Sequence, residues 1–140
     1  MSLNRWHTPK DNFRIRSISN RFKQMDKSID IYLKNNTKNN LHDIRIDLRR
    51  LRYALEIFSV YFKGNKKYEK FYNDISTIQS VTGGARDLDV IEEYARSINI
   101  YDKKIEKDQK SMNIKVNKKL KSFIKSKCYN NFKKTIKNGK

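Results

Sequence analysis

Apolar residues recur at alternating steps of three and four along most of this 140-residue chain, and this period constrains the fold more than any other feature. Such spacing gathers apolar side chains on one face of an α-helix. Helix breakers are scarce, because the chain has one proline, Pro9, and four glycines. Strand-like alternation bounded by turns is not found. The sequence therefore predicts an all-α fold.

The apolar period and its interruptions define five expected helical segments. They are 12–35, 41–63, 66–82, 86–98 and a long segment that begins near 101. The polar run 35–40 is typical of a loop, Gly64 follows a helix end, and Gly83-Gly84 is expected to end the third helix. Connections this short place consecutive helices side by side, so we expect an antiparallel bundle of four to five helices.

The second constraint is charge. Lys and Arg total 33 and Asp and Glu total 15, which gives a formal net charge of +18. An excess of this size predicts a polyanionic partner, such as nucleic acid, an anionic lipid surface or a phosphate polymer. An AT-rich genome explains part of the lysine excess but not the ten arginines, four of which lie between positions 45 and 52.

Chain length and the distribution of lysine, cysteine and histidine exclude several classes of protein. The length allows one domain over 1–140 with a lysine-rich C-terminal segment from about 110 to 140. Eleven lysines and no acids follow Asp108, so we expect order to decline beyond about Cys128. No apolar run suits a membrane span or a secretory leader, and a single cysteine excludes an internal disulfide, which together favour a cytoplasmic protein. His7, His42 and Cys128 lack metal-ligand spacing, so we predict no metal site and no cofactor.

The expected helix 41–63 carries the most informative charges. On a helical wheel, one arc beside the apolar stripe collects His42, Arg45, Arg49, Arg52 and Lys63. Arg50 points to another side, and Glu56 is the only acid on the arc. Like charges on one line cost helix stability, because surface helices usually intersperse both signs. Basic groups that rise by roughly 5–6 Å per step suit a linear array of phosphates, which the arginine fork binds through paired hydrogen bonds.

An alternative interpretation is that these arginines form salt bridges with acids on neighbouring helices. Asp87 and Asp89 are the obvious candidates. Both interpretations can hold together, because a carboxylate can orient one arginine without neutralising the whole line.

Two motifs about forty residues apart resemble the CHAD family, the conserved histidine α-helical domain. They are His42-x-x-Arg45-Ile46-x-x-Arg49-Arg50-Leu51-Arg52 and Gly84-x-Arg86-Asp87-Leu88-Asp89-Val90. The resemblance covers 41–94 and implies an all-helical domain that binds inorganic polyphosphate through a basic surface or pore. It implies phosphate contacts for His42, Arg45, Arg49, Arg50, Arg52 and Arg86. It also implies that Asp87 and Asp89 cap a helix and hold arginines.

Domains of this family usually contain two helical-bundle halves, and this chain resembles one of them. The segment 51–56 is similar to the corresponding helix of the other half as well. We therefore expect a homodimer that rebuilds the full domain by twofold symmetry, with Tyr53, Ile57 and Tyr61 lying outside the main apolar stripe. The alternatives are a fragment or a divergent single half.

The leading hypothesis for function is non-catalytic binding of inorganic polyphosphate through the basic helix face. The alternative is an RNA- or DNA-binding protein that uses the same surface, which electrostatics alone allows. Against it, the sequence contains no recognisable base-reading motif. An enzyme acting on phosphoanhydrides is not expected, because the acidic metal-binding cluster that such chemistry uses is missing from the sequence.

Overall fold

The computed structural model describes the backbone of residues 9–138 and the side chains of residues 16–135. Over this range the elements are α1 (Pro9–Lys34), α2 (Lys38–Ile57), the short 3-10 helix η2 (Ser59–Phe62), α3 (Lys66–Ser97), α4 (Lys103–Lys125) and α5 (Lys127–Asn138). The backbone that is described contains no strand. The predicted all-α fold is confirmed.

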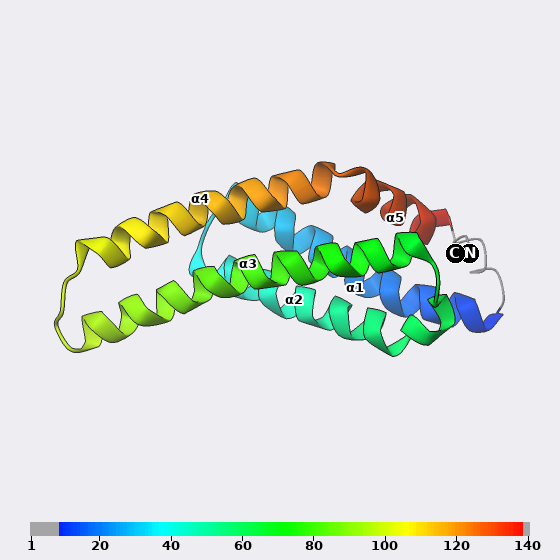
Figure 1. Ribbon diagram of the computed structural model, residues 1–140, viewed down its shortest axis with the longest axis horizontal. Helices are drawn as coiled ribbons and strands as arrows, with labels where there is room; N and C mark the ends of the chain where they lie inside the picture. Colours follow the sequence, from blue (N-terminus) through cyan, green and yellow to red (C-terminus); the bar gives the residue numbers. More distant parts are fainter. Residues whose placement is uncertain (1–8, 139–140) are drawn as a thin grey trace.

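Two antiparallel hairpins form the bundle (Figure 1). Helices α1 and α2 make the first, α3 and α4 make the second, and α2 packs against α3 to join them. The second hairpin is the longer one and extends past the ends of α1 and α2. Helix α5 lies near the opposite end, where it contacts α1, α3 and α4.

The core is built from the apolar stripes that the sequence predicts. Its members on the first hairpin are Ile18, Phe22, Met25, Ile29, Tyr32, Leu41, Ile44, Leu48, Leu51 and Leu55. Helix α3 adds Phe71 and Ile75, which are both fully buried. Because each stripe occupies one side of its helix, most of the polar and charged residues lie on the opposite side.

Helix α2 ends at Ile57, six residues earlier than the expected 63. The chain continues as η2, and this tighter turn places Phe62 in the core, where its ring stacks on Tyr68 with centroids 4.7 Å apart. Gly64 then adopts a φ of 81°, a conformation that favours glycine. Helix α3 begins where the Asn65 side chain accepts a hydrogen bond from the Tyr68 backbone N–H at 3.1 Å.

Helix α3 runs without interruption through Gly83-Gly84, so the predicted helix end there and the separate helix at 86–98 are wrong. A glycine inside a helix costs only about 1 kcal/mol relative to alanine, which packing can offset. A Cβ on Gly84 would lie 3.4 Å from the Met112 methyl carbon, so glycine lets α4 lie close to α3. The chain reverses further on, where Asn99 takes a φ of 59°.

The C-terminal region forms a further helix. Beyond Cys128, where we expected order to decline, the structure has helix α5. Tyr129 and Phe132 anchor this helix in the core, where both rings pack against Phe22 at centroid distances of 5.0 and 5.8 Å. No helix in the described range is both long and apolar enough to cross a bilayer.

Candidate functional site

Helix α2 presents the predicted basic residues beside its buried seam. The helix begins where the Thr37 side chain accepts a hydrogen bond from the Asn40 backbone N–H at 3.1 Å. With the apolar stripe turned inward, His42 and Arg49 are exposed and Arg45 is partly buried. The spacing that placed these three residues on one arc therefore leaves them at the protein surface.

Two contacts between α2 and α3 set the register of the two helices. Arg52 Nη1 donates to Gln79 Oε1 at 2.9 Å, and Lys38 Nζ lies 3.6 Å from Glu93 Oε1. These contacts are fourteen residues apart on each helix, as expected for antiparallel neighbours with equal rise. Halfway between them, Arg45 lies level with Arg86. The fold thus brings the two sequence motifs together. We call His42, Arg45, Arg49, Arg52 and Arg86 the α2–α3 basic face.

Three members of the α2–α3 basic face are not neutralised. Among the described side chains, no carboxylate lies within 4.0 Å of His42, Arg45 or Arg49. Arginine remains protonated at any physiological pH. The charge of these arginines is therefore available to an anion from outside.

Arg52 differs from its neighbours because other side chains hold it in place. Its Nε donates to Glu56 Oε1 at 2.9 Å and lies 3.3 Å from the Tyr72 hydroxyl oxygen. Tyr72 in turn donates to the same Glu56 oxygen at 2.6 Å. Hydrogen bonding with Tyr72, followed by the smaller effect of Glu56, raises the pKa of Arg52. Arg52 is thus fixed in orientation and partly neutralised, although 37% of its side chain is exposed.

Arg86 lies at the edge of the face, where it shares an acid with Lys38. Its Nη1 is 3.4 Å from the Glu93 oxygen that also contacts Lys38. Lys38 in addition lies 3.5 Å from Glu92. The network turns Arg86 toward the start of α2, and it reduces the positive charge at this end of the face.

The two predicted acidic partners hold no arginine among the described side chains. Asp89 is buried and accepts a hydrogen bond from Gln109 of α4 at 3.0 Å. Asp87 is exposed. Both lie inside α3, so the expectation that they cap a helix is wrong. Burial first, and then the charge of Asp89, raises the pKa of Tyr32. The acid motif therefore connects α3 to α4 instead of orienting the basic face.

Two of the predicted phosphate contacts differ from their expected positions, Arg50 by facing α1 and Lys63 by lying beyond the end of α2. Arg50 lines a cavity between α1 and α2 together with Arg21 and Tyr53. Lys63 follows η2, so the projection of a continuous helix to this residue does not apply. Lys63 instead lines a cavity with Glu56 and Tyr72.

Three residues that shape the face were not predicted from the sequence. Lys38 is the first residue of α2, while Tyr72 and Gln79 come from α3 and fix Arg52. Their roles depend on the α2–α3 register, which no local pattern reveals. No group of three or more His, Cys, Asp or Glu suited to a metal ion occurs among the described residues.

Comparison with known proteins gives one positive result. The sequence model of the CHAD domain family matches residues 3–96, about two thirds of the chain. The match extends through α3 and stops before α4. No curated protein and no solved structure matches this chain.

Proposed function

The chain belongs to the CHAD domain family, and we propose that it binds inorganic polyphosphate through the α2–α3 basic face. Association with polyphosphate is a property of the family. For this chain we propose in addition which surface binds polyphosphate, which residues form that surface, and how they contact the phosphates.

One observation carries the proposal. Arg45 and Arg49 lie one turn apart without a carboxylate partner among the described side chains, and Arg86 lies level with Arg45 on the next helix. Exposed arginines on a helix usually find an acid at i, i+4, because each such pair contributes about 0.3–0.5 kcal/mol. Leaving these two unpaired is reasonable if a bound anion provides the missing charge.

The dimensions of the face favour a linear anion over a compact one. From His42 to Arg52 the helix rises by about 15 Å, at 1.5 Å per residue. A single phosphate contacts only one or two of these groups, whereas a chain of phosphoryl units can contact all of them. Arg52, held by Glu56 and Gln79, is already oriented at one end of this line.

We propose a binding role without catalysis. The two acids that contact arginines of the face are engaged by these cations, since Glu56 contacts Arg52 and Glu93 contacts Arg86 and Lys38. Metal-assisted phosphoryl transfer requires carboxylates that are available to hold a cation. Phosphate release from polyphosphate in the presence of Mg²⁺ would contradict this part of the proposal.

We also propose that the chain forms a homodimer. Tyr53, Ile57 and Tyr61, which the sequence placed outside the main stripe, are exposed in the monomer. Large apolar residues at a protein surface are available for such a contact. The end of the α3–α4 hairpin exposes a second set of large apolar residues, so the protein offers two candidate faces for the dimer.

A competition experiment tests the ligand class. Long-chain polyphosphate and single-stranded RNA are compared as competitors for a labelled polyphosphate at equal phosphate concentration and about 150 mM salt, where weak nonspecific contacts are screened. Polyphosphate is expected to compete at least about tenfold better, since the face lacks the exposed aromatic rings on which bases stack. RNA competing equally well would favour the nucleic-acid alternative.

A further inference from the structure

The far end of the α3–α4 hairpin differs in charge from the rest of the protein. We define the hairpin tip as residues 85–110, the segment that includes the turn between α3 and α4. It contains seven acidic and six basic residues, so its net charge is −1, whereas the whole chain carries +18. All other residues together therefore carry +19. Figure 1 shows that the outer part of this segment extends past the ends of α1 and α2, whereas its first residues, through Glu93, lie beside α2.

The hairpin tip also concentrates exposed apolar surface. Its exposed large apolar residues are Val90, Ile91, Tyr94, Ile98, Ile100 and Tyr101. Ile91, Tyr94 and Ile98 follow the helical period and form one stripe over the end of α3 and its C-cap residue. Tyr94 is 64% exposed and Tyr101 is 74% exposed. An apolar patch on a projecting element marks an interaction surface more often than a scattered exposed residue does.

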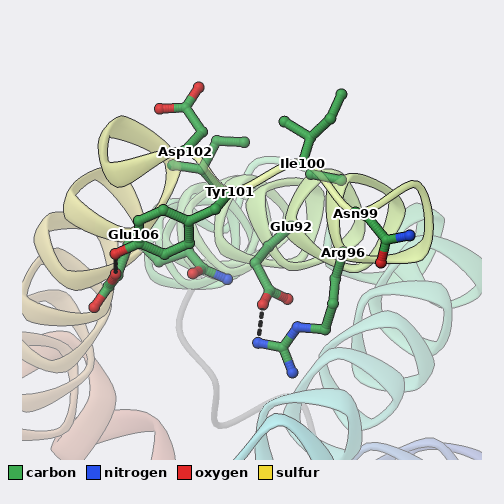
Figure 2. Close-up of a pocket in the computed structure, with 10 residues that line it drawn as sticks. Glu92, Arg96, Asn99, Ile100, Tyr101, Asp102 and Glu106 are labelled. Carbon is green, nitrogen blue, oxygen red and sulfur yellow. Dashed lines mark hydrogen bonds and ion pairs between the residues drawn. The ribbon is translucent and has the colours of Figure 1, made fainter.

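Several charges at the hairpin tip are paired within the tip itself, in addition to the contacts of Glu92 and Glu93 with Lys38 of α2. Figure 2 shows Glu92 and Arg96 side by side at a cavity of about 480 Å³, and the two form an ion pair. On the other side of this cavity, the Tyr101 hydroxyl donates to Glu106 Oε2 at 2.9 Å, and Glu106 also lies 3.7 Å from Lys110. Both signs are therefore interspersed over a short distance.

The alternative contact face near the end of α2 has a different electrostatic setting. Tyr53 and Ile57 line a cavity that also contains Arg21 and Arg50. In a symmetric contact the same patch meets itself, so each basic group would approach its own copy. Like charges brought together at an interface cost several kcal/mol. This face is thus poorly suited to self-association.

We infer that a second copy of this chain packs against the hairpin tip, so that two hairpins form a four-helix contact. An isologous interface must be self-complementary, and a neutral apolar patch with both signs interspersed meets that condition. Docking at the projecting tip also keeps the two +19 bodies at opposite ends of the dimer. Electrostatic repulsion therefore selects this surface over the face formed by Tyr53 and Ile57.

The dimer has a consequence for binding that rests on the proposed function. Each protomer carries an α2–α3 basic face, so a tip-to-tip dimer presents two of them to one long polyphosphate chain. Binding at the second face is then intramolecular, which raises overall affinity without a new contact.

Sedimentation velocity without polyphosphate tests the inference. At about 50 µM protein the chain is expected to sediment as a dimer, with twice the 16.8 kDa monomer mass. The double variant Tyr94→Glu plus Ile98→Glu should sediment as a monomer, with a dissociation constant raised at least about a hundredfold. Its thermal melt, measured by circular dichroism, shows that the fold persists, because both residues are exposed.

A matched variant decides between the two faces. Tyr53→Glu plus Ile57→Glu introduces the same change at two sites that are also exposed and is expected to leave the dimer intact. A wild-type chain that is monomeric up to this concentration would overturn the inference, as would a dimer that only the Tyr53 and Ile57 variant dissociates. Since no polyphosphate is present, either result leaves the proposed polyphosphate binding to be judged by its own assay.

Discussion

Helix α3 borders two regions that differ in how their charged side chains are paired. Beside its middle, the α2–α3 basic face leaves Arg45 and Arg49 without a carboxylate among the described side chains. Farther along, the hairpin tip pairs Arg96 with Glu92 and has almost no net charge. The first arrangement suits an external polyanion, and the second suits a surface that must not repel its own copy. The positions of the unpaired arginines are therefore more informative about a binding surface than the net charge of the whole chain.

The largest expected effect is on the free energy of unfolding, and it differs between the core beneath the basic face and the exposed hairpin tip. Leu48 is fully buried under the face, so Leu48→Ala is expected to lower the free energy of unfolding by about 2–5 kcal/mol. Ile100 is 55% exposed at the tip, so Ile100→Ala should change it by less than about 0.5 kcal/mol. Urea denaturation in solutions dilute enough to keep the chain monomeric measures both values. Similar losses would mean that the tip is as tightly packed as the core.

A smaller effect concerns the acid at the border of the two regions. Glu93 partly neutralises Arg86 and Lys38, so Glu93→Gln is expected to tighten polyphosphate binding by about 1 kcal/mol, or roughly fivefold. The control is Glu106→Gln, which removes the same charge farther from the α2–α3 basic face, where Lys110 and Tyr101 are the partners. Isothermal titration gives both affinities. Equal tightening in the two variants would indicate that only net charge matters.

The smallest expected effect concerns the helix that joins the two regions. A Cβ on Gly83 would contact nothing within 4 Å, so Gly83→Ala should raise the free energy of unfolding by about 0.5–1 kcal/mol. Gly64 has a φ of 81°, so Gly64→Ala should lower it by about 1 kcal/mol. Thermal melts of the two variants check the opposite signs. A loss of stability in Gly83→Ala would argue that α3 bends at this point in solution.

Features that depend on local periodicity, such as the buried side of a helix, could be predicted from the sequence. The stripe from Leu41 to Leu55 correctly identified the buried side of α2, because residues three and four apart share a helix face. The same spacing placed Arg45 and Arg49 together beside that stripe. Arg50, which the family motif includes, faces α1 instead. A motif written as a linear string does not distinguish the faces of a helix.

Features that depend on distant segments could not be predicted in this way. Gly83-Gly84 continues a helix because α4 packs there through Met112, and that contact spans 28 residues. The pairing of Lys38 with Glu93 requires the α2–α3 register. Helix α5 is anchored by Tyr129 and Phe132 against Phe22 of α1, over more than a hundred residues of sequence. Each is a tertiary contact that overrides a local preference.

The central claim is that unpaired arginines of the α2–α3 basic face, and not bulk charge, bind polyphosphate. Isothermal titration at about 150 mM salt compares Arg45→Ala plus Arg49→Ala with Arg16→Ala plus Arg21→Ala, a pair of exposed arginines on α1 that removes the same charge. The first variant is expected to lose about 2–4 kcal/mol of binding free energy, or at least roughly thirtyfold in affinity, because two charge-assisted contacts disappear. The second should lose less than about threefold. Equal losses in the two variants would contradict the claim.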